Sequence, residues 1–115
     1  MSWLLGLLLG AQLAVARPTV VLFSGPWCGA CVAMEPVWKS FVKQNQGRFH
    51  TVYVDVDQVE SPAYAKYGHL WEEDRHMPQL LWIDGQGRVL ERRPGFVPLR
   101  ELQQWRPRSS SLLDS

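Results

Sequence analysis

Cysteine is scarce in this chain, since its 115 residues contain only Cys28 and Cys31. A framework of several disulfides, which stabilises many small secreted domains, is therefore excluded. An excess of charge is missing too, because 12 Lys and Arg residues are matched by 11 Asp and Glu residues. Nucleic acid is consequently not expected as a partner, since its recognition relies on a basic surface.

Internal repeats and low-complexity segments are also absent from the sequence. The length fits one domain with a single hydrophobic core. Hydrophobic residues make up 46% and charged residues 20% of the chain, a composition typical of globular rather than disordered proteins. We expect a monomer with one folded domain over residues 17–106 and a flexible tail over residues 107–115.

The first sixteen residues, MSWLLGLLLGAQLAVA, contain no charged side chain. Their apolar run has the length of a signal-peptide core, and Ala14–Ala16 forms an A-x-A cleavage pattern, although no Lys or Arg precedes the run. The run ends at Arg17-Pro18, short of the about 20 apolar residues that span a bilayer. We interpret residues 1–16 as a signal peptide or an uncleaved membrane anchor, which predicts an extracytoplasmic (periplasmic, secreted or lumenal) protein. A buried first helix is the alternative.

Hydrophobic patterns predict the element order β-α-β-α-β-β-α. The valine-rich run TVVLF is typical of a strand buried on both faces. A crossover helix makes the first two strands parallel, and a short turn makes the last two an antiparallel hairpin. The class is therefore α/β, with a mixed four-stranded sheet flanked by helices. The expected strands are residues 19–23, 49–57, 79–83 and 88–93, and the expected helices run from Cys28 to a C-cap at Gly47, from Pro62 to Gly68 and from Pro98 to Trp105.

The two cysteines lie three residues apart at the start of the first expected helix. Cys31 belongs to an apolar stripe that continues with Met34 and Trp38. Cys28 lies at the helix N-terminus, where unpaired N–H groups and the helix dipole stabilise a thiolate. We expect Cys28 to attack a disulfide and Cys31 to resolve the resulting mixed disulfide. Half of a metal site and two small core residues are the alternative interpretations of the pair.

The motif Trp27-Cys28-Gly29-Ala30-Cys31, placed after a buried strand, resembles the thioredoxin family. The resemblance covers about residues 19–105 and implies a thioredoxin-like fold. It also implies a thiol–disulfide oxidoreductase that works through the Cys28/Cys31 disulfide, with no cofactor and no metal. The implied partners are client proteins with disulfides or thiols and a membrane thiol electron donor or acceptor. Further matching positions are Pro36, the segment Asp57–Gly68, Met77-Pro78 and Gly95.

The same resemblance implies a client-binding surface around the cysteines. It implies a cis Met77-Pro78 bond facing the pair, with the Met77 backbone pairing to an extended client segment; a trans proline at a strand edge is the alternative. Trp27 is implied to cover the disulfide, and a core tryptophan is the alternative. Gly95 is implied to admit the client backbone, unless it is an ordinary turn glycine. The residues assigned to client binding are Trp27, Gly29, Ala30, Met77, Pro78 and Gly95.

Several positions depart from the family's pattern. Leu22 stands where thioredoxins proper have a buried aspartate, Tyr53 lies near the place of its lysine partner, and Ala30 replaces the proline between the cysteines. These changes leave the direction of electron flow open. An insertion, HLWEEDRH over residues 69–76, lengthens the loop before Met77. We interpret this insertion as a lip that selects partners, with a merely longer solvated loop as the alternative.

The sequence therefore predicts an extracytoplasmic thiol–disulfide oxidoreductase that reduces disulfides in client proteins. An oxidant or isomerase of the same fold shares this chemistry and is the first alternative. A copper(I) carrier is the second, since Cys28, Cys31, His76 and Met77 include the soft ligands that this ion prefers. A redox-silent binding module is the third, although binding alone does not require two thiols at this spacing.

Overall fold

The computed structural model describes residues 17–106, so the expected signal or anchor and the expected tail lie outside the described residues. The expected order of helices and strands is confirmed, and a short 3₁₀ helix, η1, is added. No helix of the described part is both long and apolar enough to cross a bilayer. The elements are β1 (Thr19–Ser24), α2 (Gly29–Gln44), β2 (His50–Asp55), α3 (Pro62–Tyr67), η1 (Gly68–Leu70), β3 (Gln79–Ile83), β4 (Val89–Pro94) and α4 (Leu99–Gln104).

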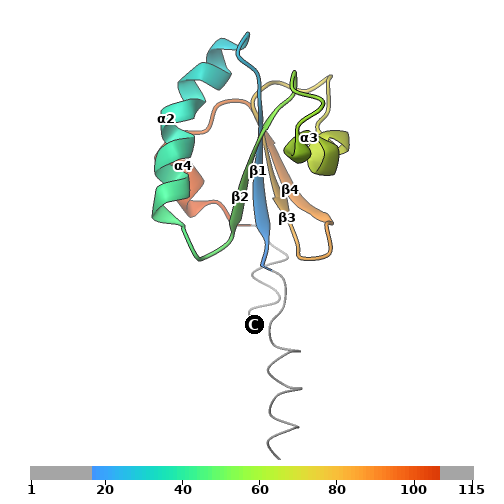
Figure 1. Ribbon diagram of the computed structural model, residues 1–115. Coiled ribbons are helices and arrows are strands. Elements are labelled where there is room, and N and C mark those ends of the chain that lie inside the picture. The colour runs from blue at the N-terminus through green and yellow to red at the C-terminus, as the bar shows by residue number, and fades with distance from the viewer. Residues whose placement is uncertain (1–16, 107–115) are drawn as a thin grey trace, which may run out of the picture.

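The four strands form one mixed sheet in the order β2-β1-β3-β4. Strand β1 pairs parallel with β2 and antiparallel with β3, and β3 pairs antiparallel with β4. Helices α2 and α4 cover one face of the sheet and α3 covers the other (Figure 1). The predicted parallel pair and the predicted hairpin are both confirmed.

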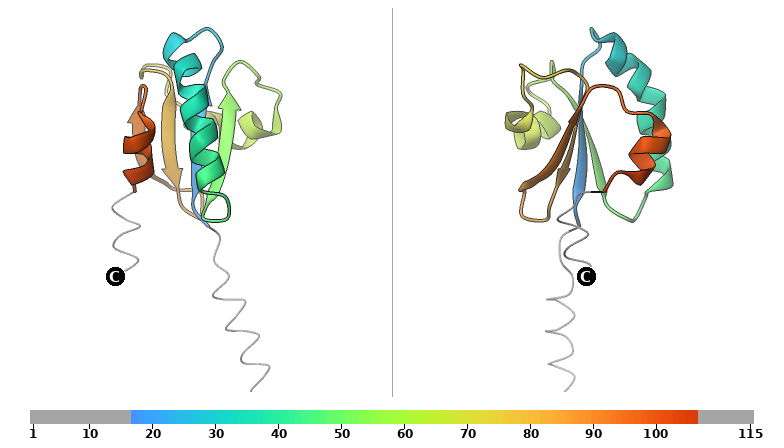
Figure 2. Two further views of the ribbon diagram at one scale, coloured as in Figure 1. Left: turned by 90° about the vertical axis from the view of Figure 1, so that its left-hand side faces the viewer. Right: turned by 180° about the vertical axis from the view of Figure 1, so that it is seen from behind.

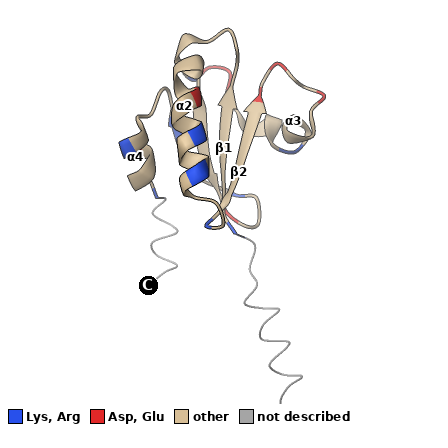
Figure 3. Ribbon diagram, turned by 60° about the vertical axis from the view of Figure 1, so that its left-hand side comes forward, with Lys and Arg blue, Asp and Glu red and all other residues tan. Residues whose placement is uncertain are grey.

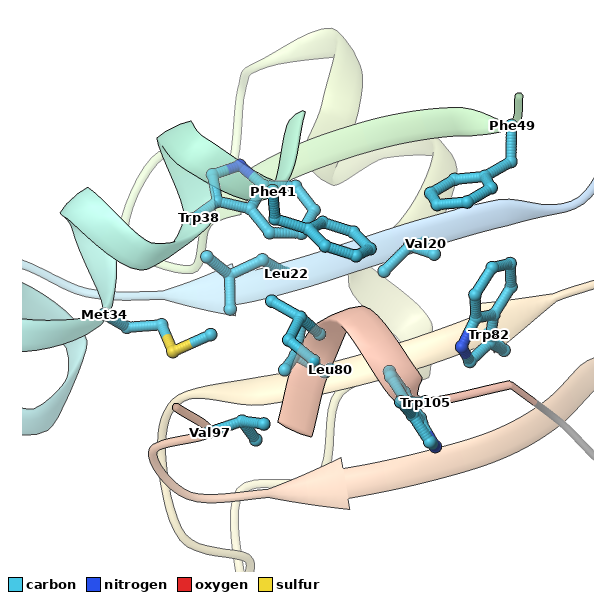
Figure 4. Close-up of a cluster of buried hydrophobic side chains, with 11 residues drawn as sticks. Val20, Leu22, Met34, Trp38, Phe41, Phe49, Leu80, Trp82, Val97 and Trp105 are labelled. Carbon is cyan, nitrogen blue, oxygen red and sulfur yellow. The ribbon is translucent and has the colours of Figure 1, made fainter. Parts of the chain in front are cut away.

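Strand β1 lies at the centre of the core, and its residues alternate between the two faces. Val20 and Leu22 pack in a cluster with residues of α2 and α4, as Figure 4 shows. Val21 and Phe23 pack in a second cluster on the α3 side. All four of these side chains are fully buried, which is the pattern expected for a strand covered on both faces.

Aromatic rings fill the end of the first cluster that is farthest from the cysteines. The rings of Phe49 and Trp82 meet edge to face with centroids 4.8 Å apart, and Trp82 meets Trp105 in the same way at 5.9 Å. The guanidinium of Arg106 lies over Phe49 and Trp82 at 5.6 and 5.7 Å. These contacts hold the C-terminal end of α4 against the sheet.

The C-terminus of α2 corrects one sequence prediction. Asn45, not Gly47, caps this helix: its side-chain amide donates to the carbonyl of Phe41 at 2.8 Å, and its N–H donates to Val42. Gly47 lies two residues later, in the turn toward β2, with φ +84. Both residue types favour helix ends, but only Asn45 has a side chain that reaches the free carbonyls.

Strand β2 is shorter than the predicted range 49–57. Its end is fixed by Asp55, whose carboxylate accepts the N–H of Asp57 at 2.9 Å and whose carbonyl accepts the N–H of Gln58 at 3.0 Å. This local turn removes Val56 and Asp57 from the strand. By contrast, α3 begins as predicted, because the Ser61 hydroxyl accepts the N–H of Tyr64 at 3.1 Å and Pro62 opens the helix.

The two ends of the described chain lie together, at one end of the sheet. Figure 2 shows that β1 starts there and that α4 returns there, while the connection from β1 to α2 lies at the opposite end. The cysteine pair occupies that connection, because Cys28 immediately precedes α2. The redox pair is thus separated by the length of the sheet from residues 17 and 106.

Candidate active site

Cys28 is the N-cap of α2. Its backbone is extended, with φ −105 and ψ 117, and its sulfur accepts a hydrogen bond from the N–H of Cys31 at 3.2 Å. That N–H is one of the donors that a helix start leaves unpaired. Cys28 is half-buried, so the residue is partly exposed at the surface. The geometry suits a nucleophilic sulfur with a backbone donor already aimed at it.

Cys31 differs from Cys28 in its environment. It lies one turn into α2 and is only 1% exposed. Burial, reinforced by the hydrogen bond to Cys28, raises the pKa of Cys31 to about 11, against opposing hydrogen bonds from the Gly25 N–H and the Ser24 hydroxyl. At neutral pH it is therefore a protonated, shielded thiol, as the resolving partner of an exposed cysteine should be.

Trp27 lies beside the pair as an exposed side chain, 60% accessible, and not as a core tryptophan. Its ring covers Gly25, where a Cβ atom would lie 2.7 Å from Trp27 Cε2. A larger residue at position 25 would therefore displace the Trp27 ring from this place. Gly29 and Ala30, between the cysteines, are exposed as well. All three residues assigned to client binding on this loop are accessible to a partner.

The Met77-Pro78 segment lies at the adjacent end of β3, and its peptide bond is cis. Phe23 pairs with Gln79, so the next position along brings Pro78 opposite Ser24, at the base of the cysteine loop. The carbonyl of Pro78 accepts the N–H of Gly95 at 2.7 Å. Gly95 has φ +88, a conformation that favours glycine, although a Cβ there would meet nothing within 4 Å.

The insertion 69–76 is a loop held firmly against the sheet. The buried amide of Gln79 makes two hydrogen bonds to the backbone of Glu72, one of them at 2.9 Å from the Glu72 N–H. Arg92 of β4 donates to the carbonyl of Leu70 at 2.8 Å and pairs with the Glu72 carboxylate at 3.1 Å. Arg75 pairs with the same carboxylate at 2.9 Å. We call these contacts around Glu72 the loop clamp.

Sequence reasoning missed the loop clamp. Gln79 is fully buried, and Glu72 and Arg92 are half-buried. The one available signal was a polar residue at the start of the otherwise apolar strand QLLWI, since a buried amide needs hydrogen-bond partners. Its partner Glu72 lies seven residues away in the sequence, and Arg92 lies twenty residues from Glu72, so the pattern could not identify these contacts.

Comparison with known proteins decides the family. The sequence profile of the family described as Thioredoxin matches residues 11–105. The chain belongs to the thioredoxin family. A thioredoxin of Mycoplasmoides gallisepticum is 30% identical over 92 residues, which cover 80% of this chain and 84% of that protein. Thioredoxin Asp f 28 of Aspergillus fumigatus is 37% identical over 94 residues, covering 80% and 78%.

Two further similarities are more limited. A thiol:disulfide interchange protein TxlA homolog of Synechocystis is 29% identical over 97 residues, which are 84% of this chain but 51% of that protein. The chain thus spans about half the length of this relative. The solved structure of thioredoxin-2, described as a component of malaria parasite protein secretion machinery, matches with a TM-score of 0.59 at 23% identity, covering 75% of this chain and 77% of that one. This last similarity supports the fold alone.

Family and geometry together identify a thioredoxin-like thiol–disulfide oxidoreductase with the pair Cys28/Cys31. Thioredoxins act on disulfide-containing proteins, and their chemistry is carried by the cysteine pair itself. Within residues 17–106, no group of three His, Cys, Asp or Glu side chains is placed to hold a metal ion. His76 is exposed and Met77 packs against the α3-side cluster, so this geometry adds no support to a copper site.

The raised pKa of Cys31 predicts how the stability of the reduced protein depends on pH. A thiol whose pKa is higher in the folded state than its ordinary value of 9.0 stabilises the fold below pH 9, and this contribution is lost as the pH rises toward about 11. Relative to Cys31→Ala, the reduced protein should lose about 2 kcal/mol of unfolding free energy between pH 8 and pH 11.

Urea unfolding of both proteins under reducing conditions measures this difference. Comparison with the alanine variant removes the contributions of Tyr and Lys groups that titrate in the same range. If the difference in unfolding free energy between the wild type and Cys31→Ala stays constant from pH 8 to pH 11, the raised pKa of Cys31 is contradicted.

Proposed function

We propose that this protein is an extracytoplasmic reductant of client-protein disulfides, supplied with electrons by a membrane thiol donor. The main observation in support of disulfide exchange is the contrast between the half-buried Cys28 and the buried Cys31. The cis Met77-Pro78 segment precedes β3 at the same end of the sheet. The named relatives that support this direction are thioredoxins.

The reaction proceeds by two disulfide exchanges. The Cys28 thiolate attacks one sulfur of a client disulfide, forming a Cys28–client disulfide and releasing the other client sulfur as a thiolate, which takes up a proton from water. Cys31 then loses its proton and attacks Cys28. The Cys28–Cys31 bond forms, the Cys28–client bond breaks, and the second client sulfur leaves and takes up a proton. Two electrons pass from the cysteine pair to the client.

The surroundings of Cys28 are also consistent with a reductant. Strong disulfide oxidants owe their potential to a stabilised reduced form. In the described residues, one backbone N–H, that of Cys31 at 3.2 Å, donates to the Cys28 sulfur. This is a neutral donor, and hydrogen bonds from charged donors are roughly twice as strong.

The reduction potential of the Cys28/Cys31 couple tests the proposed direction. We expect a value near or below about −250 mV, in the range of thioredoxin-like reductants. Tryptophan fluorescence of the full chain, equilibrated in thiol buffers, measures the couple, because Trp27 lies beside it; Cys31→Ser controls for changes unrelated to the disulfide. A value above about −180 mV would instead favour the oxidant or isomerase alternative.

The proposed location rests on residues 1–16, whose uncharged apolar run and A-x-A pattern suit export. We expect the full chain with a C-terminal tag, expressed in a bacterium, to appear outside the cytoplasm. If the segment is cleaved, mass spectrometry should find a mature protein whose N-terminus is Arg17. If it is an anchor, the uncleaved chain should be found in the membrane fraction. Full-length protein confined to the soluble cytoplasmic fraction would contradict the proposal.

We also propose that the loop 69–76 selects clients. The loop clamp fixes its position beside Met77-Pro78, and Glu73 and Asp74 remain exposed at its tip. Asp57 and Glu60 are exposed on the connection after β2. Figure 3 shows acidic residues on the loops at the cysteine end and basic residues along the lower part of α2. This charge distribution favours clients with basic residues near the disulfide.

Neutralising the loop tip with Glu73→Gln and Asp74→Asn tests this selection. We expect kcat/KM to fall about threefold for a basic disulfide peptide at low salt, and to stay level or rise for an acidic peptide of equal length. Deleting residues 70–74 is a poorer test, because it removes Glu72 and leaves the buried Gln79 amide unpaired. Equal effects on the two peptides would contradict a role in selection.

A further inference from the structure

Ser24 occupies the last position of β1, on the face of the sheet that α2 covers. Side chains alternate along a strand, and Val20 and Leu22 of β1 both pack in the cluster shared with α2. Ser24 follows in the same row and is 1% exposed. Its backbone is held on the β2 side, where Ser24 pairs with Asp55 and its carbonyl accepts the Val56 N–H at 3.0 Å.

Cys31 occupies the matching position on α2. The buried stripe of this helix consists of Cys31, Met34, Trp38 and Phe41, and Cys31 is its first member. The stripe faces the row of β1 that contains Val20 and Leu22. Helix α2 runs back along β1, so the end of the strand row meets the start of the helix stripe, and the buried side chains of Ser24 and Cys31 face the same layer between strand and helix (Figure 1). Consistent with this placement, the Ser24 side chain is one of the groups that lower the pKa of Cys31.

Besides burial, the partners that shift the pKa of Cys31 are Cys28, the Gly25 backbone and the Ser24 side chain. Leu22, the next residue down the same row, is apolar and fully buried, so it offers no group that could exchange a proton. Of these three partners, the Ser24 hydroxyl is the one that a side-chain substitution can remove without changing the backbone or the redox pair.

We propose that Ser24 is a positioning residue for the resolving cysteine, whose hydroxyl donates a hydrogen bond to the Cys31 sulfur as that sulfur becomes a thiolate. The bond is needed when Cys31 gives up its proton and attacks Cys28, and again in the reverse step, when Cys31 leaves as a thiolate. The role of Ser24 is therefore the same whichever direction of net electron flow applies.

The change Ser24→Ala removes this donor while leaving the strand intact. A hydrogen bond to a charged group is among the stronger ones in proteins, so we expect the resolution step to slow about tenfold and the Cys28–client disulfide to accumulate. The pKa of Cys31 should rise further, because one of the groups that lower it is gone. Ser24→Thr keeps a hydroxyl and should restore both properties.

Two measurements on the reduced full chain provide the test. Rapid acid quenching followed by mass spectrometry measures the lifetime of the mixed disulfide with a peptide client, and NMR of ¹³Cβ-labelled cysteine follows the titration of Cys31. Thr19→Val is the matched control, because it removes a nearly buried hydroxyl from the opposite end of the same strand. The control should resemble the wild type in both measurements.

The outcomes separate a hydrogen-bonding role from a packing role. A longer-lived mixed disulfide and a higher Cys31 pKa in Ser24→Ala, with recovery in Ser24→Thr, would support the proposal. A wild-type lifetime and titration in Ser24→Ala would overturn it. Equal impairment in Ser24→Ala and Ser24→Thr would overturn it as well, because the hydroxyl would then not be the determining group.

Discussion

The burial of β1 on both faces is the constraint on which the rest of the structure depends. Four consecutive side chains of this strand, Val20–Phe23, are fully buried, and β2 and β3 occupy both of its edges. The chain can therefore turn only beyond Ser24, at the end of the sheet. That turn places Gly25, Cys28 and the start of α2 at the rim, where Cys28 is accessible while Cys31 points back into the core.

A second constraint is the need of a buried polar side chain, at the start of β3, for hydrogen-bond partners. Gln79 is fully buried at the start of β3, and an unpaired amide there would cost about 1–3 kcal/mol. Its bonds to the Glu72 backbone avoid this cost and fix the inserted loop. The loop that leads to Met77-Pro78 is thus held by hydrogen bonds to β3 and β4, while the cysteines follow directly from the buried strand β1.

The sequence predicted those features that depend on neighbouring residues. Strand β3 matches its predicted range, and α3 begins where Ser61 and Pro62 predict. The predictions failed where side chains compete for the same backbone groups: Asn45 caps α2 in place of Gly47, and Asp55 ends β2 early. Residue types indicate that a cap or turn is near, but they do not decide which of two suitable side chains reaches the backbone.

In the site, the sequence predicted the cysteine pair, because its motif is continuous, and the structure shows that Trp27, Gly29 and Ala30 beside it are exposed. It could not identify contacts between separate elements, such as Gln79 with Glu72 or Arg92 with Leu70, or the placement of Ser24 on the same layer as Cys31. A serine at the end of an apolar strand resembles any polar strand terminus. Only the packing of α2 on β1 places this serine at the end of the strand that faces the start of the helix, where Cys31 lies.

The positions of the chain ends determine which client disulfides Cys28 could contact if the protein were tethered. Residues 17 and 106 lie at the end of the sheet opposite the cysteines (Figure 2), and a strand of six residues such as β1 is about 20 Å long. If the protein is tethered through residue 17, its reactive sulfur points away from the attachment surface by about that length. A client disulfide lying flush with that surface would be out of range, whereas one carried on a projecting segment would meet Cys28 directly.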